Sequence, residues 1–267
     1  MMLFNRMPKP PVRARTRNET PPIQSLDRGL IILETVGRSG HPVSLRQLTE
    51  VLGIDRSSAF RLANTLKRRG FLSNPAAGKD YVLGASLWRL SRQYDWSAML
   101  AAIAHDHLET LAVVTGETAH LAVREGRKAL FIDHATTNHV IAISGQTGEA
   151  VPAYCTSHGK ALLTDFDEAG LRQLFGGKPL ARHTKNTLRN VAELARDCVE
   201  IRERGYATDD SEFMDGVRCV AAPIRDKEGM VVASIGISAP AGRFPAARQA
   251  PIAGHVTRIA AQISALI

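Results

Sequence analysis

The sequence has 267 residues, of which 44% are hydrophobic, and it carries a formal net charge of +8 at pH 7. This length favours two domains, and the hydrophobic fraction is typical of globular domains with buried cores. No apolar run approaches the roughly 20 residues that a membrane-spanning helix needs, and the N-terminus lacks the apolar stretch of a secretion signal. We therefore expect a cytoplasmic protein without a membrane partner.

The basic excess lies entirely in the N-terminal third of the chain. Residues 1–92 contain 16 Lys and Arg against 6 Asp and Glu, whereas residues 93–267 contain 18 against 20. This asymmetry is typical of a nucleic-acid-binding or membrane-facing module joined to a neutral one. The alternative is a module that is basic for no functional reason. Residues 1–22 are rich in Pro and Arg and are predicted to form a disordered basic arm.

Two helices are predicted after this arm. The first covers about Ser25 to Val36 and has one apolar side made of Leu26, Leu30, Leu33 and Val36. The second begins after Ser44, which has Gln47 three residues later as in a capping box, and it ends near Gly53. Asp55 is the next N-cap candidate. A connection of about three residues forces a steep crossing of the helices, as in a helix-turn-helix.

The third helix lies in "IDRSSAFRLANTLKRRGFL" and has two chemically different sides. At about 100° per residue, one sector holds Ser57, Arg61, Asn64 and Arg68, and the opposite sector holds Ala59, Leu62, Ala63 and Leu66. The following "FLSNPAAGKDYVLG" has two short apolar runs around a turn, which indicates a β-hairpin. Residues 23–84 therefore read as a winged helix-turn-helix domain.

The polar side of this helix is predicted to contact double-stranded DNA. The N-terminal residues of a recognition helix read base edges, and its flanks contact phosphates. Arg61 suits guanine, Asn64 suits adenine, and Phe60 either contacts a thymine methyl group or is half buried in the core. The alternative is a charged solvent-exposed face. The candidate base-reading residues are Arg56, Ser57, Ser58, Arg61 and Asn64, and the candidate phosphate contacts are Lys67, Arg68, Arg69 and Lys79.

The remaining chain is predicted to be a linker helix and an α+β domain. Residues 85–98 form the linker helix, and residues 99–267 form the second domain. Strands are expected in "TAHLAVREG", "KALFIDHAT", "HVIAIS", "YATDDSEF", "VRCVAAPIRD" and "MVVASIGIS". Helices are expected near 157–164, 167–175 and 190–204 and from about Pro245 onward. Strands grouped in hairpins with helices around them indicate an antiparallel sheet.

Several of these stretches resemble the IclR family of bacterial transcription regulators. In the N-terminal part they are "IQSLDRGLIILETV", "SLRQLTEVLGIDRSSAFRLANTLKRRGFL" and "YVLGASLWRL". The resemblance continues through "VPAYCTSHGKALL" to "GYATDDSEFMDGVRCVAAPI". In the last stretch Gly205, Asp209, Glu212 and the run Cys219-Val220-Ala221 match the family signature. The resemblance covers nearly everything from Ile23 onward.

The resemblance implies a repressor or activator that is a homodimer or a dimer of dimers. It implies a winged helix-turn-helix for operator DNA, a linker helix and a GAF-like effector-binding domain, with no cofactor. The effector would be a small organic acid or an aromatic metabolite that shifts the population of DNA-competent arrangements. Family members often have two small residues where Ser157 and His158 stand. Transferred by position, the effector contacts are Ser157, His158, Asp209, Cys219, Gly236 and Ser238.

Elementary chemistry supports the first of these positions. A helix that begins near Ser157 would expose N–H groups and a positive dipole end, which suit a carboxylate. Gly159 would let a ligand approach the backbone, and His158 would either bind the ligand or form a structural hydrogen bond. Asp209 either lines the site or caps a strand, and Cys219 is read as a small buried side chain. Lys160 is read as a structural ion-pair residue.

Two other classes of function compete with the regulator. An enzyme would use Cys155 as nucleophile and His158 as base, but no orienting acid follows from the sequence. His105 and His107 point in nearly opposite directions on a helix, so we expect no metal site. The three cysteines, Cys155, Cys198 and Cys219, form no C-x-x-C pair, which fits a reducing compartment. The third class is an architectural DNA-binding protein without an effector, which would not need the large second domain.

Overall fold

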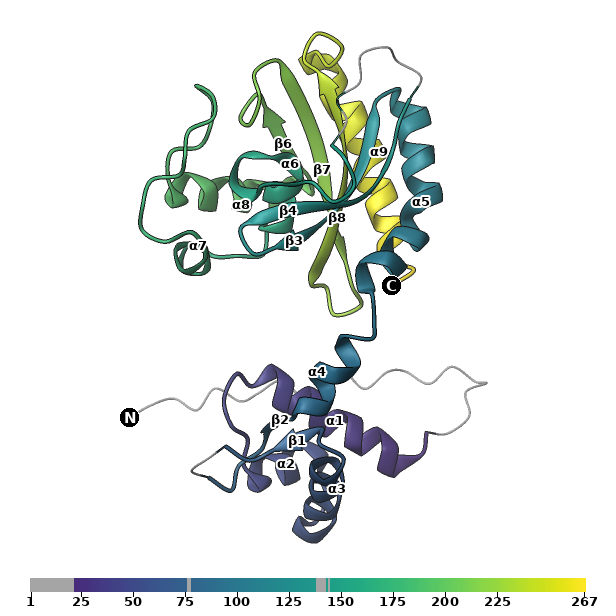
Figure 1. Cartoon of the computed structure of the whole chain (residues 1–267), viewed down its shortest axis with the longest axis vertical. Helices are drawn as coiled ribbons and strands as arrows, with labels where there is room; N and C mark the ends of the chain where they lie inside the picture. Colours follow the sequence, from purple (N-terminus) through teal and green to yellow (C-terminus); the bar gives the residue numbers. More distant parts are fainter. Residues whose placement is uncertain (1–21, 76–77, 138–142, 144) are drawn as a thin grey trace. The chain divides into compact units, whose positions relative to one another are not determined.

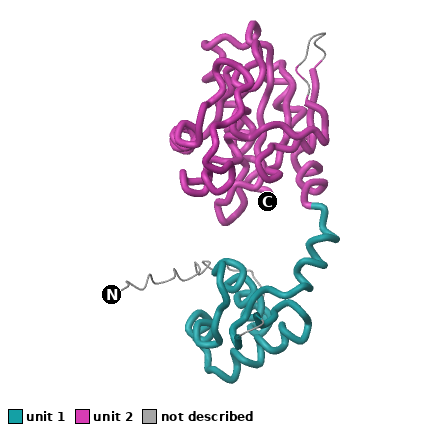
Figure 2. Tube along the Cα trace, turned by 60° about the vertical axis from the view of Figure 1, so that its left-hand side comes forward, with its two compact units in different colours: residues 1–95 teal, residues 96–267 magenta. Residues whose placement is uncertain are grey.

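The structure is a computed structural model that describes residues 22–75, 78–137, 143 and 145–267. Most of the expected basic arm and most of the strand expected in "HVIAIS" lie outside these residues. The chain forms two compact units, which meet between Asp95 and Trp96 and are described separately below (Figure 2). Within the described ranges, no helix combines the length and the apolar character needed to cross a membrane.

Unit 1 contains the predicted three helices and hairpin. Ser44 and Gln47 form the expected capping box, Gly53 ends the second helix in the left-handed region with φ of 61°, and the Asp55 side chain caps the third. The elements are α1 (Gln24–Arg38), α2 (Leu45–Leu52), α3 (Arg56–Arg68), β1 (Leu72–Ser73), β2 (Val82–Leu83) and α4 (Ala85–Ser91), with β1 and β2 antiparallel (Figure 1). The core joins Ile32 and Val36 of α1 to Leu48, Ala63, Leu72 and Tyr81.

Helix α1 has two apolar stripes, and the prediction chose the wrong one as the buried side. Gly29, Ile32 and Val36 face the core. Leu26 and Leu30 were expected there, but they are 61% and 51% exposed. At about 100° per residue the two stripes lie about 100° apart on the helix. The apolar periodicity alone could not say which stripe meets helices α2 and α3.

Helix α4 is attached to the end of α3 by close backbone contact. The Gly84 N–H donates to the Phe71 carbonyl at 2.8 Å, and the Ser86 hydroxyl donates to the Arg69 carbonyl at 2.8 Å. A Cβ atom at Gly84 would lie 2.2 Å from the Gly70 carbonyl oxygen, so only glycine fits there. Residues 85–98, expected as one linker helix, instead form α4 and the first turn of α5 (Trp96–Thr115), with residues 92–95 between the two helices.

Unit 2 is built on a six-stranded sheet in the order β5-β4-β3-β8-β7-β6, and every pairing is antiparallel. This agrees with the expected α+β class. The strands are β3 (Thr118–Glu125), β4 (Lys128–Ala135), β5 (Ala150–Pro152), β6 (Ala207–Asp210), β7 (Val217–Arg225) and β8 (Val231–Pro240). Between them lie η1 (Ala153–Cys155), α6 (Ser157–Leu162), α7 (Glu168–Phe175) and α8 (Val191–Arg204), and α9 (Ala246–Ser264) follows the sheet.

The two faces of this sheet differ in chemistry. Helices α5 and α9 cover one face (Figure 1), where Leu121, Ile235 and Ile237 pack into the main core. Short helix α6 contacts the opposite face across β3, β4, β6, β7 and β8. Because successive strand residues point to opposite faces, the residues between the core positions face α6. On β3 and β8 these are Thr118, His120, Ser234, Gly236 and Ser238.

Candidate functional site

The polar side of α3 is exposed, as predicted. Its opposite side is buried through Ala59 and Ala63, which are both 0% exposed. No ion pair between described residues includes an arginine of α3. The guanidinium groups are therefore not occupied by internal carboxylates and can neutralise phosphates or bind guanine edges. The exposed residues of this side are Arg56, Ser57, Arg61, Asn64, Lys67, Arg68 and Arg69.

The two serines at the start of α3 contribute to its cap. The Ser57 hydroxyl donates to Asp55 Oδ1 at 2.7 Å, and the Ser58 N–H donates to the same oxygen at 2.9 Å. These hydrogen bonds, led by that from Ser57, hold the pKa of Asp55 well below its usual range. Ser57 is exposed, whereas Ser58 is half buried. The cap fixes the first turn of α3, from which Arg56 and Arg61 project.

The wing and Phe60 complete the surface around α3. Lys79 is exposed at the hairpin turn. The Asn74 side chain donates to the Lys79 and Asp80 carbonyls at 3.2 and 2.8 Å, which stabilises this turn. Phe60 is 51% exposed and lies outside the hydrophobic core of unit 1. The prediction that left a core role open for Phe60 is therefore wrong, and its ring is available to a partner.

The expected effector residues of the strands form one row across the sheet in unit 2. Thr118 of β3 lies opposite Ser238 of β8, Ser238 lies opposite Cys219 of β7, and Cys219 lies opposite Asp209 of β6. The Cys219 thiol donates to the Ser238 hydroxyl at 3.3 Å. All four side chains are buried. Gly236 lies on the same face, and a Cβ there would come within 2.2 Å of the Val220 carbonyl oxygen.

Ser157 and His158 begin helix α6 and are 1% and 2% exposed. Thr156 caps this helix by accepting from the Gly159 N–H at 3.2 Å. A Cβ at Gly159 would lie 2.3 Å from the Ala153 carbonyl oxygen, so the glycine admits the chain's own backbone and not a ligand. With only six residues and this cap, the anion-binding argument from the helix end is replaced by the side chains of Ser157 and His158.

Sequence reasoning missed His120 and Thr118 of β3. The His120 ring is 1% exposed, and its centre lies 6.0 Å from that of His158 and 4.9 Å from that of Phe131. The pattern "TAHLAV" contains the signal, because its polar residues alternate with residues of the main core. We call the set Thr118, His120, Ser157, His158, Asp209, Cys219, Ser234 and Ser238 the buried polar site.

The buried polar site contains unpaired polar atoms and uncharged histidines. Thr118 Oγ1, His120 Nδ1, Ser157 Oγ and His158 Nε2 are buried without a hydrogen-bond partner among the described residues. Burial lowers the pKa of His120 to about 4 and that of His158 to about 3, so both rings are neutral at pH 7. Unpaired buried polar groups are rare in native proteins, and a bound molecule would satisfy them.

Lys160 next to this site is held by two carboxylates. Its ammonium is 2% exposed and lies 2.7 Å from Asp197 Oδ2 and 2.5 Å from Glu212 Oε1. Burial opposes its charge, but Glu212 and Asp197 raise its pKa above the usual value. The Glu212 N–H donates to Asp209 Oδ1 at 2.7 Å, which connects the ion pairs to the buried polar site. This agrees with the interpretation of Lys160 as a structural ion-pair residue.

Asp209 should make the stability of unit 2 depend on pH. Burial raises its pKa from 3.8 to about 7, despite the hydrogen bond from Glu212. Between these pH values the folded carboxyl keeps a proton that the unfolded one has lost, so stability decreases as the pH rises. Asp209→Asn removes this loss. We expect the melting temperature of the variant to rise relative to the parent protein from about pH 4.5 to about pH 7.5.

Asp210→Asn is the control for this measurement, because Asp210 is exposed and pairs with Arg218 at 2.6 Å. Its melting temperature should keep a nearly constant offset over the same pH range. Parallel curves for Asp209→Asn and the parent protein would contradict the raised pKa.

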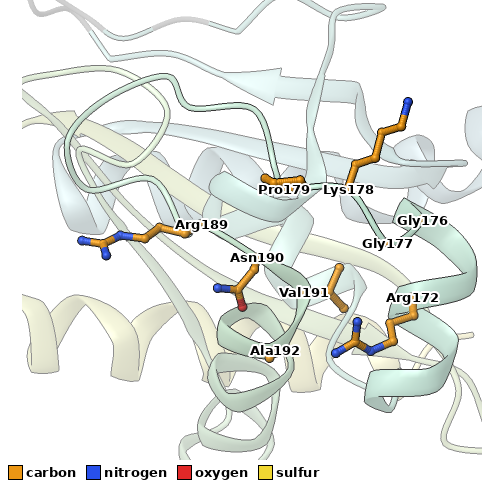
Figure 3. A pocket seen from close by; sticks show the side chains of 9 residues that line it. All are labelled: Arg172, Gly176, Gly177, Lys178, Pro179, Arg189, Asn190, Val191 and Ala192. Atoms are coloured by element: carbon orange, nitrogen blue, oxygen red, sulfur yellow. The ribbon is translucent and has the colours of Figure 1, made fainter.

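The most open pocket of unit 2 lies elsewhere and has a volume of about 560 Å³. It is formed by the end of α7, the start of α8 and the segment between them. Figure 3 shows that the Lys178 and Arg189 side chains point away from each other, and Arg172 pairs with Glu168 at 2.5 Å. The basic groups around this pocket do not converge on one point. The buried polar site remains the better candidate for a ligand.

The fold and these two sites define a class of protein, which is a transcription regulator with a winged helix-turn-helix and a separate ligand-binding domain. Models of known families agree. The "IclR helix-turn-helix domain" matches residues 25–75, and the "Bacterial transcriptional regulator IclR C-terminal" domain matches residues 93–265. The chain belongs to the IclR family of bacterial transcriptional regulators, which confirms the resemblance and the fold expected from the sequence.

Relatives match this chain over nearly its full length. The transcriptional repressor IclR of Escherichia coli K12 is 31% identical over 251 residues, which are 93% of this chain and 92% of that protein. The transcriptional regulator BhcR of Paracoccus denitrificans is 32% identical over 242 residues, 91% of this chain and 86% of that protein. The crystal structure of Thermotoga maritima IclR has a TM-score of 0.59 at 29% identity and covers 91% of this chain and 98% of that one.

Proposed function

We propose that this regulator reads its operator with α3, in the major groove, and that Arg61 and Asn64 contact bases there. Arg56 and Ser57 lie at the N-terminal end of the same helix, where base contacts are usual. Arg68 and Lys79 neutralise phosphates. The observation that carries this proposal is the exposed face of α3 whose arginines have no carboxylate partner among the described residues.

We propose the buried polar site as the effector site. Ser157, His158, Asp209, Cys219 and Ser238 meet there on the α6 side of the sheet. The unpaired side-chain atoms support this assignment, because a bound metabolite would supply their partners. Binding would then shift the population of DNA-competent arrangements. Nothing in the site requires a cofactor.

A catalytic role of Cys155 is not supported by its chemistry. A nucleophilic cysteine needs a lowered pKa, whereas burial raises the pKa of Cys155 to about 12. His158, the proposed base, has a pKa of about 3 and bonds to Ser234 at 3.0 Å. No group of three His, Cys, Asp or Glu side chains in the described ranges could hold a metal ion. We therefore propose a sensor and not a catalyst.

We also propose that two copies of the chain associate through the exposed stripe of α1. Ile23, Leu26 and Leu30 are 70%, 61% and 51% exposed, which is costly for three apolar side chains in one row. Leu26→Glu should therefore lower the dimer population and weaken binding to an operator with two half-sites. Analytical ultracentrifugation of the variant measures the association.

Gln24→Glu provides a matched control for this prediction. It introduces the same charge at an exposed position of α1, about 160° away from Leu26. This control should dimerise like the parent protein. Equal dimer populations for Leu26→Glu and the parent protein would rule out the stripe as the interface.

The function is tested on purified protein with its own promoter DNA. Mobility-shift titrations give operator affinity, and melting temperatures with a panel of carboxylates identify stabilising compounds. A sensor is stabilised without turnover and changes its operator affinity, whereas turnover indicates an enzyme. An unchanged melting temperature and operator affinity with every compound would favour an architectural DNA-binding protein.

A further inference from the structure

Two buried histidines contain ring nitrogens that nothing in the described structure satisfies. His120 and His158 are 1% and 2% exposed. His120 Nδ1 and His158 Nε2 have no hydrogen-bond partner in the described part of the chain. A polar group removed from water without a partner costs free energy, so such groups persist where a ligand uses them.

The other nitrogen of each ring determines what the unpaired one can do. The Gly145 N–H donates to His120 Nε2 at 3.0 Å, so the proton of this neutral ring is on Nδ1. His158 Nδ1 lies 3.0 Å from Ser234 Oγ, and a hydrogen bond to the Ser234 backbone raises the histidine's pKa, as expected when Nδ1–H donates. The site therefore offers an unpaired N–H donor on His120 and an unpaired acceptor on His158.

The surroundings of these two rings favour a small polar ligand. Their centres are 6.0 Å apart with planes at 87°, and Phe131 packs against both at 4.9 and 5.4 Å. Ser157 Oγ and Thr118 Oγ1 add two unpaired hydroxyl groups. The neighbouring cation, Lys160, is already shared between two carboxylates. A ligand is therefore held by neutral hydrogen bonds and not by a free positive charge.

We propose that His120 and His158 bind the effector and select a 2-hydroxy carboxylate. The carboxylate accepts from His120 Nδ1–H and from the hydroxyls of Ser157 and Thr118. The 2-hydroxyl donates to His158 Nε2. This ligand class fits because its donor and its acceptors are close together, as the two rings require. The inference rests on the proposed function for the location of the effector site, and it assigns the ligand chemistry there.

This arrangement discriminates against close analogues. A 2-oxo acid places a carbonyl lone pair against the lone pair of His158 Nε2, and the unsubstituted acid leaves that nitrogen unpaired. A metal ion is disfavoured at His120, because metal binding through Nδ1 would move the ring proton to Nε2, against the Gly145 N–H.

The test uses the full-length protein and matched compounds. Calorimetry and melting temperatures are recorded with lactate, pyruvate and propionate, and with mandelate and phenylglyoxylate as larger analogues, using both enantiomers of each hydroxy acid. We expect a hydroxy acid to bind roughly tenfold or more tightly than its oxo and unsubstituted analogues. Equal or tighter binding of the oxo acids overturns the inference, and so does failure of every hydroxy acid to bind.

Two variants assign the effect to His158. His158→Leu should lose the preference for the hydroxyl group while keeping its affinity for the unsubstituted acid. His158→Gln, whose amide oxygen can accept, should keep part of the preference. A preserved preference in His158→Leu overturns the role of this ring. If the parent protein binds operator DNA and another class of compound releases it, the hydroxy-acid inference fails while the proposed function stands. Absence of operator binding by the parent protein counts against the proposed function itself.

Discussion

Arg61→Ala is expected to weaken operator binding by about 1–3 kcal/mol and to relax the base preference at one position of each half-site. The reason is geometric. Arg61 is exposed in the second turn of α3, and its side chain has no ion-pair partner among the described residues, so its bidentate face is free for guanine. Mobility-shift titrations on the operator and on single-base variants measure both effects.

Arg172→Ala is the matched control for this experiment. Arg172 is an exposed arginine of α7 in unit 2, where it pairs with Glu168. Its loss should leave operator affinity unchanged. Arg68→Ala should weaken binding to all sequences similarly and reduce the salt dependence, because Arg68 is assigned to a phosphate. Unchanged operator binding by Arg61→Ala would refute the recognition-helix assignment.

Lys160→Met should destabilise unit 2 by about 3–5 kcal/mol, which lowers its melting temperature by roughly 6–20 °C. The substitution removes the cation between Asp197 and Glu212 and leaves their buried carboxylates unpaired. Thermal unfolding followed by circular dichroism measures the loss. Glu212 is the more affected partner, since Asp197 keeps Arg204 at 3.4 Å.

Two further variants separate this mechanism from simple loss of packing. Glu212→Gln added to Lys160→Met removes one uncompensated charge and should recover part of the stability. Lys178→Met removes an exposed lysine and should change stability by less than about 0.5 kcal/mol. Equal melting temperatures for Lys160→Met and Lys178→Met would mean that the buried ion pairs contribute nothing.

Local signals in the sequence predicted unit 1 well. Asp55, Ser44 and Gly53 marked helix ends because capping is decided within a few residues of the chain. The polar side of α3 was equally readable, since its spacing is fixed by the helix. Helix α1 was misread because it has two apolar stripes, and only the packing of α2 and α3 decides which one is buried.

The effector site depends on contacts that one sequence does not contain. Thr118 and Ser238 are 120 positions apart, and only the strand order brings them opposite each other. His120 was missed for the same reason, because its neighbour His158 belongs to a helix on the far side of the chain's sequence order. Family resemblance supplied Asp209 and Cys219 by position, but it could not supply the histidine pair, in which this chain departs from the family's small residues.

The division of labour between the two faces of the sheet has an evolutionary consequence. Leu121 and Ile235 hold unit 2 together on one face, while their strand neighbours His120 and Ser234 lie on the other. Mutations at the latter positions can therefore change which metabolite is recognised without rebuilding the scaffold. Descendants of one ancestral sensor can in this way acquire new chemical specificities while inheriting the same architecture.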